Sequence, residues 1–252
     1  MRSNAMQGNI HTQTIDGAAV HLYLPPQTEW SDPLPCLYIA GQEQPAQSKQ
    51  QLLQIMQILE PQLCRNALPP FALASVSPAQ WDAAYSPWPA AMGERSFSGM
   101  ADDYFSFLHT RVHPYLKTHY GCSDAREAIG FIGYSLAGVA ALYAYLAHPF
   151  FRLCASVSGS LWYPEWIPYL KQSYHQALPG KIYLSLGKAE VKTRSPLLRE
   201  NQPCTEQTAV LLSEVLGDTN VCFAWNNGNH FYEIPERHAR AISWLLQDFR
   251  LL

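Results

Sequence analysis

The chain has 252 residues, which is enough for one large α/β domain, and 48% of them are hydrophobic while 15% are charged. The formal net charge is −3 and no basic cluster occurs, so the sequence has no electrostatic footprint for nucleic acid or for an anionic membrane. No apolar run approaches the roughly 18 residues of a membrane-spanning helix.

The eight strands that we predict form a mostly parallel sheet. Short apolar runs rich in β-forming residues alternate with longer runs of helical period, which is typical of such a sheet with helices on both faces. The predicted strands are residues 12–15, 18–24, 36–40, 71–76, 128–132, 153–157, 181–186 and 221–225.

Helices are predicted over residues 48–59, 102–120 and 138–147, and from Pro235 onward. Pro114 should kink the second helix or mark a restart. The third helix is apolar nearly all round, so we expect it to be buried. Residues 78–99 are rich in Pro, Trp and small residues without a period, which predicts a long ordered loop over one end of the sheet.

The cysteines and the chain start give further expectations. The six cysteines, Cys36, Cys64, Cys122, Cys154, Cys204 and Cys222, show no CxxC or Cys/His ligand spacing, so we expect buried free thiols and no metal site.

Residues 1–5 resemble an expression-tag remnant, and residues 6–252 are expected to form a single domain. The N-terminus lacks an apolar signal segment, so we expect a cytoplasmic protein; if a signal peptide was removed, a periplasmic one is the alternative.

The sequence from Gly133 to Ala137 is close to the G-x-S-x-G nucleophile elbow. In that motif the serine lies on a strained strand-to-helix turn, and small residues two before and two after it let the strand and helix approach closely. Here Ala137 replaces the second glycine and Gly138 follows it. Because the motif lies between a predicted strand and a buried helix, we predict an α/β-hydrolase with Ser135 as nucleophile; an ordinary turn serine is the alternative.

Hydrolases of this fold order their triad as serine, acid, histidine. Of the nine histidines, His230 alone lies between the last strand and the final helix, and we predict that it is the general base rather than a helix-capping loop histidine. Glu190 follows the seventh strand, where the acid should hold the histidine tautomer. The alternatives are a solvated glutamate at this position or Glu200 as the acid, while Asp218 lies at the wrong end of the sheet.

Acyl transfer also requires hydrogen-bond donors for the developing oxyanion. We predict the backbone N–H of Leu136, directly after the nucleophile, and the backbone N–H of Gln42, in the loop after the third strand.

Further motifs carry a family resemblance. They are Phe105-Ser106-Phe107-Leu108, His113-Pro114-Tyr115-Leu116, His119-Tyr120, His148-Pro149 and Ser158-Gly159-Ser160-Leu161-Trp162. With the elbow, they resemble the putative esterase (esterase D-like) family, which includes enterobactin-esterase-type siderophore hydrolases, feruloyl esterases and mycolyltransferases. The resemblance covers residues 34–250 and implies a triad of Ser135, Glu190 and His230, although some siderophore-type members work with a Ser-His dyad.

One departure from the family concerns the substrate. Siderophore-type members commonly carry an arginine and an aspartate before a Thr-Pro in the loop after the fourth strand, where this chain has Trp81 and Ala84. A contact to an anionic ferric siderophore is thereby lost, unless Arg95 or Arg194 replaces it.

Aromatic residues of the same region are expected to form the substrate pocket. Trp81, Tyr85 and Trp88, together with Trp162 and with Tyr134 beside the nucleophile, would wall an aromatic acyl or alcohol site. Core packing is the alternative for each of them.

The sequence therefore predicts a serine carboxylic-ester hydrolase that needs no cofactor, acting on a small or aryl ester rather than on nucleic acid or membrane. The alternatives are a siderophore trilactone esterase, an acyltransferase on the same fold, and a catalytically inactive binding module. The oligomeric state is left open.

Overall fold

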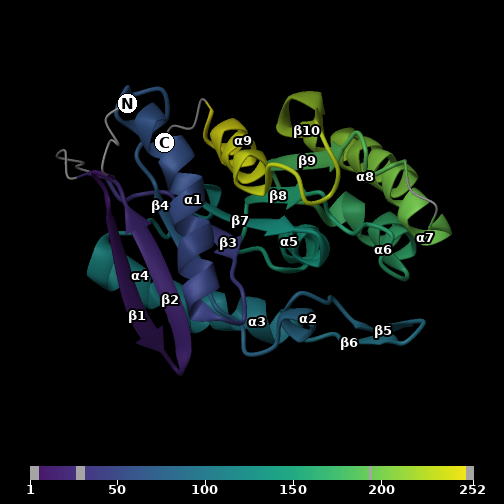
Figure 1. Cartoon of the computed structure of the whole chain (residues 1–252), viewed down its shortest axis with the longest axis horizontal. Coiled ribbons are helices and arrows are strands. Elements are labelled where there is room, and N and C mark those ends of the chain that lie inside the picture. Colours follow the sequence, from purple (N-terminus) through teal and green to yellow (C-terminus); the bar gives the residue numbers. More distant parts are fainter. Residues whose placement is uncertain (1–5, 27–31, 193–194, 248–252) are drawn as a thin grey trace.

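The computed structural model describes residues 6–26, 32–192 and 195–247 (Figure 1). Two sequence predictions, the tag remnant at residues 1–5 and the contribution of Arg194, lie outside the described residues.

In the described residues, eight strands form one sheet in the order β1-β2-β4-β3-β7-β8-β9-β10. Strands β1 and β2 are antiparallel, β2 is antiparallel to β4, and all other neighbours are parallel. The mostly parallel eight-stranded sheet is thus confirmed. The bounds are β1 Asn9–Ile15, β2 Ala18–Leu24, β3 Cys36–Ala40, β4 Ala72–Val76, β7 Ile129–Tyr134, β8 Leu153–Val157, β9 Lys181–Gly187 and β10 Val221–Asn226.

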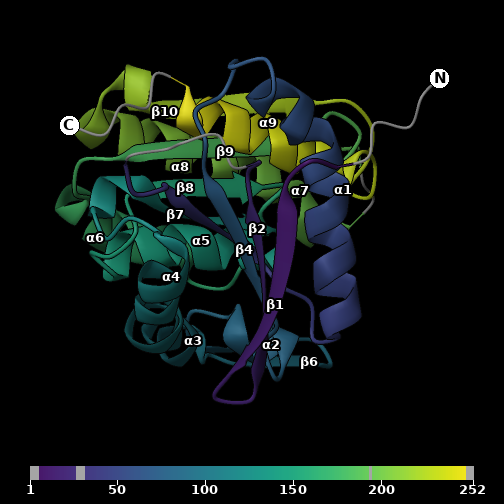
Figure 2. The ribbon, with the colours of Figure 1, turned by 90° about the vertical axis from the view of Figure 1, so that its left-hand side faces the viewer.

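Helices cover both faces of the sheet (Figures 1 and 2). On one face α1 (Pro45–Leu63) packs against α9 (Ile234–Leu246), and Leu52 of α1 and Ile242 of α9 belong to the same core cluster. The second core cluster lies on the other face, where the helices are α3 (Ala101–Phe107), α4 (His113–Tyr120), α5 (Leu136–Ala147), α6 (Trp166–Ser173) and α8 (Asn201–Leu216). As predicted, α5 is buried along almost its whole length.

The segment predicted as one long loop contains regular structure. It holds the short helix α2 (Trp81–Ala84) and a hairpin of β5 (Pro89–Met92) and β6 (Arg95–Ser98), which extends from the main body in Figure 1. Gly93 has a φ of 56° at the hairpin turn. Each strand has only four residues and lacks the run of β-branched or aromatic residues that marks a strand in sequence.

Two helical regions also differ from expectation. The predicted helix over residues 102–120 is divided by a π-helical turn, Leu108–Val112, directly before α4. Pro114 has no N–H to donate to the preceding turn, and the wider turn accommodates that loss. Helix α8, with the short α7 (Pro196–Arg199) before it, was not predicted because Thr205 and Thr208 take core-facing positions where a helix usually has apolar residues.

All six cysteines are unpaired in the described residues, and Cys36, Cys122 and Cys154 are buried as expected, whereas Cys64 is exposed. Over the same part of the chain, none of the helices combines the length and the apolar character needed to cross a bilayer.

Candidate active site

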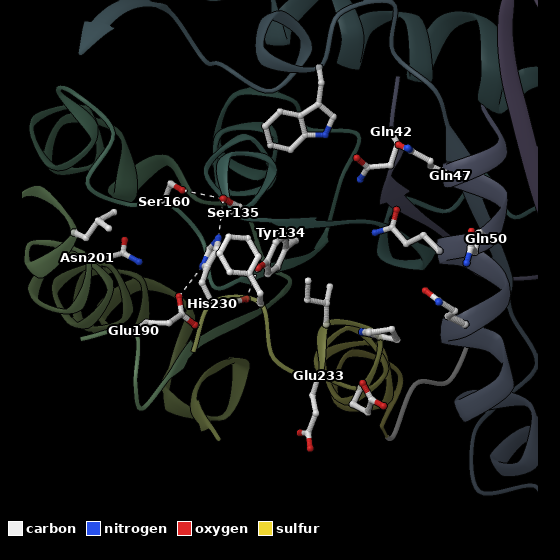
Figure 3. A pocket seen from close by; sticks show the side chains of 18 of the residues that line it. Gln42, Gln47, Gln50, Tyr134, Ser135, Ser160, Glu190, Asn201, His230 and Glu233 are labelled. Atoms are coloured by element: carbon white, nitrogen blue, oxygen red, sulfur yellow. Dashed lines mark hydrogen bonds and ion pairs between the residues drawn. The ribbon is translucent and has the colours of Figure 1, made fainter. Parts of the chain in front are cut away.

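The carboxyl ends of three parallel strands bring the predicted catalytic residues together. Ser135 follows β7, Glu190 lies just beyond β9, and His230 lies in the loop after β10. Since parallel strands end at the same edge of a sheet, residues far apart in the chain meet there. Figure 3 shows the three side chains in a row, joined by hydrogen bonds.

The backbone at Ser135 has the strained geometry of a nucleophile elbow. Its φ is 59° and its ψ is −124°, values that L-residues rarely adopt. A Cβ atom at Gly133 would lie 1.8 Å from the carbonyl oxygen of Ala137, and one at Gly138 would lie 2.7 Å from the Cα of Gly159. Gly138 therefore makes the close approach to the turn after β8, which explains why the motif accepts alanine at position 137.

A continuous hydrogen-bonded chain links the acid, the histidine and the serine. His230 Nδ1 lies 2.8 Å from Glu190 Oε2, and His230 Nε2 lies 3.1 Å from Ser135 Oγ. The side chain of Glu190 is 8% exposed and that of His230 is 29% exposed. Glu190 is thus shielded while His230 faces the cavity, an arrangement compatible with the triad that the sequence predicts.

The second oxygen of Glu190 is held by three donors. Oε1 accepts from the backbone N–H of Gly187 at 2.7 Å, from Ser158 Oγ at 2.8 Å and from Arg237 Nη1 at 2.8 Å. Burial acts to raise the pKa of this carboxyl, but the hydrogen bonds from His230, Ser158 and Gly187 outweigh it, and the pKa lies below its ordinary value. Glu190 is therefore a carboxylate at neutral pH.

Sequence reasoning missed Arg237. This arginine of α9 is fully buried, and besides Glu190 it donates through Nη2 to the carbonyl oxygens of Asn227 at 2.8 Å and Asn229 at 2.7 Å. It thus fixes both the acid and the loop that carries His230. A signal exists in the sequence, because Arg237 lies one turn before Ala241 on the apolar stripe of α9, and a buried charge requires a partner.

Tyr134 restrains His230 from the other side. Its hydroxyl donates to the carbonyl oxygen of His230, and the two rings lie 4.8 Å apart at an angle of 31°. Tyr134 also lines the cavity, as predicted for a residue beside the substrate. His238, the neighbouring histidine, is fully buried in α9, and burial lowers its pKa to about 4, so it packs as a neutral ring.

Donors and a second hydroxyl surround the nucleophile. The backbone N–H of Leu136 directly follows Ser135, whereas the backbone N–H of Gln42 donates to Ser48 Oγ at 2.8 Å and would have to be shared with an oxyanion. Ser160 Oγ lies 3.3 Å from Ser135 Oγ, and the Ser160 N–H binds the carbonyl oxygen of Ser135. Ser160 was not among the predicted site residues, although it belongs to the motif Ser158-Gly159-Ser160 that carries part of the family resemblance.

The comparison with protein families decides the family of this chain. Residues 13–233 match the family model described as "Putative esterase". The chain belongs to this family. It is accordingly a hydrolase of esters with the α/β-hydrolase fold.

The esterase is similar to one curated bacterial protein in sequence and to solved bacterial and fungal structures in fold. It is 25% identical over 248 residues to the uncharacterized protein YbbA of Bacillus subtilis (strain 168), covering 95% of this chain and 97% of that protein. The solved structure of siderophore hydrolase EstB from Aspergillus nidulans superimposes with a TM-score of 0.74 at 14% identity, over 100% and 98% of the two chains. An IroE-like serine hydrolase from Shewanella oneidensis gives a TM-score of 0.76 at 13% identity, over 97% and 82%. These two likenesses show the fold.

In this esterase Ser135 lines a cavity of about 1080 Å³. This volume lies slightly above the usual range for small-molecule binding sites. Trp81 and Trp162 line the cavity, as predicted. Arg95 lines it too, but pairs with Asp82 at 3.7 Å.

Two of the expected pocket aromatics lie elsewhere. Tyr85 is fully buried and donates to the carbonyl oxygen of Gly41 at 3.2 Å, so it supports the loop after β3 and does not wall the cavity. Trp88 donates to the carbonyl oxygen of Pro164 and packs against Tyr163. Their assignment to the pocket was wrong, and the core-packing alternative holds, because the chain after Trp81 turns into the core and residues 83–87 are all buried.

Proposed function

We propose that this protein is a serine esterase that cleaves carboxylic esters through a Ser135-His230-Glu190 triad and an acyl-enzyme. The observation that carries the proposal is the hydrogen-bonded chain from Glu190 to Ser135, at an elbow that opens into a large cavity. A packing role for these three residues would not explain the strained φ of 59° at Ser135.

In the proposed reaction, Ser135 Oγ attacks the ester carbonyl carbon and His230 Nε2 takes the serine proton. Glu190 holds the imidazole and stabilises its cationic form. The Leu136 N–H, with the Gln42 N–H as second donor, stabilises the oxyanion. Collapse of the tetrahedral intermediate breaks the ester C–O bond, and His230 protonates the departing alcohol. Water then attacks the acyl-enzyme, giving its proton to His230. When the second tetrahedral intermediate collapses, the bond from the acyl carbon to Ser135 Oγ breaks, His230 returns the proton to Ser135 Oγ, and the carboxylic acid product departs.

The proposed substrate is a small or aryl ester rather than an anionic siderophore. Trp81 and Trp162 offer flat apolar faces beside Ser135, while Arg95, the one guanidinium among the cavity residues that the structure describes, is paired with Asp82. The likeness to a siderophore hydrolase makes trilactone cleavage the second candidate. The two are separated by kcat/KM for an enterobactin-like trilactone and for aryl esters. A preference for the trilactone above about tenfold, or roughly 1.4 kcal/mol, contradicts the aryl-ester proposal.

Replacement of the nucleophile tests the reaction itself. We expect Ser135→Ala to abolish turnover of p-nitrophenyl acetate and labelling by a serine-directed phosphonate, with an unchanged melting curve. A folded variant with activity within about tenfold of wild type contradicts the assignment. Product analysis with and without an acceptor alcohol distinguishes hydrolysis from acyl transfer, and failure of wild type to react with the phosphonate indicates an inactive binding module.

A further inference from the structure

Helix α1 turns a face of glutamines toward the catalytic cavity. Gln47, Gln50, Gln51 and Gln54 all line it, and their spacing of three, four and seven places them on one side of the helix. The α1 residues that line the cavity therefore carry amides and no charge, while the opposite side of the helix enters the core. Figure 3 shows Gln47 and Gln50 on one side of Ser135, with Asn201 on the other.

Three buried polar atoms of described cavity-lining residues lack a hydrogen-bond partner. Two are acceptors, Oε1 of Gln51 and Oδ1 of Asn201, and the third is a donor, Nε1 of Trp81. An unsatisfied buried acceptor costs about 1–3 kcal/mol, so proteins rarely keep one without a use. The terminal amide torsions are soft, so a small rotation turns either oxygen toward a ligand that donates a hydrogen bond.

The charges around the cavity favour a neutral ligand. Within the described part of the chain, the carboxylates Glu190, Glu233 and Glu236 line it together with one guanidinium, that of Arg95. Glu190 and Arg95 are already paired within the protein, and Glu233 lies 3.6 Å from Arg240. Among the described lining residues, every charge except that of Glu236 is thus paired within the protein, and no described lining cation is left to bind an anionic substrate. Side-chain amides, by contrast, donate and accept at once and match hydroxyl or amide groups.

We propose that the ester cleaved at Ser135 carries a neutral arm with several hydroxyl or amide groups, and that the glutamine face of α1 binds this arm. The inference rests on the proposed esterase function and specifies its substrate. Two sources share the required chemistry: an acylated sugar and an acylated serine in a neutral peptide.

The test compares three acetate esters, so that the acyl transfer itself is constant. They are a methyl glucoside acetylated on its primary hydroxyl, a blocked O-acetylserine amide, and hexyl acetate, with released acetate as the readout. Gln47→Leu, Gln50→Leu and Gln54→Leu remove amides at nearly constant volume. Gln57→Leu is the matched control, since Gln57 is exposed on the same helix but does not line the cavity.

We expect each cavity variant to lower kcat/KM for a polar ester by about 3- to 10-fold while leaving hexyl acetate within about twofold and the control at wild-type rates. A loss of kcat/KM confined to the glucoside identifies the substrate as a sugar ester. A loss confined to the serine amide identifies it as an acylated peptide. Unchanged kcat/KM for both polar esters, or equal losses on all three, overturns the inference. If wild type cleaves none of these esters and no p-nitrophenyl acetate either, the proposed function itself has failed.

Discussion

The most informative single substitution is Glu190→Gln, because the surroundings dictate how the new amide must lie. The position of Oε1 receives three donors, from Gly187, Ser158 and Arg237, so the amide oxygen will occupy it. The NH₂ group then faces His230 Nδ1 and must donate to it. His230 will consequently carry its proton on Nε2, pointing at Ser135 Oγ, and cannot accept the serine proton.

We expect this substitution to lower kcat by a large factor and to lower the free energy of unfolding by a smaller amount. A histidine held in the wrong tautomer loses on the order of 10⁴ in kcat, which corresponds to about 5.4 kcal/mol of transition-state stabilisation. Loss of the carboxylate also leaves the buried Arg237 without its counter-charge. Because the amide oxygen still accepts from Arg237, we expect the low end of the roughly 3–5 kcal/mol associated with broken buried pairs.

The assay is the initial rate of p-nitrophenyl butyrate hydrolysis, with urea unfolding measured on the same preparations. Glu200→Gln serves as the control, since Glu200 is exposed and was the alternative acid. A folded Glu190→Gln protein with a rate within about tenfold of wild type refutes the tautomer argument and indicates a Ser-His dyad. A loss confined to the Glu200 variant would place the acid there.

Three further predictions concern stability. Arg237→Met should lower the free energy of unfolding by about 3–5 kcal/mol in urea, and a wild-type midpoint would contradict the buried ion pair. Gly138→Ala should cost about 1–3 kcal/mol, because its Cβ would meet the Cα of Gly159 at 2.7 Å, and a melting temperature equal to wild type would argue against that contact. The pKa of Glu190 is depressed below its ordinary 4.5, so its contribution to stability is complete above that pH and is lost as the pH falls further. The melting temperature of wild type should therefore fall more steeply below about pH 4.5 than that of Glu190→Gln, and parallel curves would contradict the shift.

The sequence predicted the sheet and the proposed triad because both depend on order along the chain. Apolar strand runs mark the parallel sheet, and the elbow, the acid and the histidine each follow a strand whose carboxyl end reaches the same edge. That triad assignment itself awaits the substitutions described above.

Features that depend on contacts across the fold were not predicted. Arg237 finds its partner 47 residues away, and a charged residue in a C-terminal helix ordinarily indicates a solvent-facing position. Helix α8 buries Thr205 and Thr208, where Trp166 Nε1 donates to Thr208 Oγ1 at 3.1 Å, so its core-facing side has no apolar period. The difference between Trp81 and Tyr85, one in the cavity and one in the core, likewise depends on three-dimensional packing.

The location of Arg237 has a consequence for how the protein is made. Helix α9, the last element described, is synthesised after the elbow, the acid and the loop of His230. Because Arg237 ties Glu190 to the carbonyl oxygens of Asn227 and Asn229 in that loop, the geometry of the proposed triad is complete only when α9 docks on the sheet. If Ser135, His230 and Glu190 act as proposed, a nascent chain in which α9 has not folded carries Ser135 and His230 without the arginine that holds Glu190 and the loop of His230. Activity is then expected only after α9 has docked.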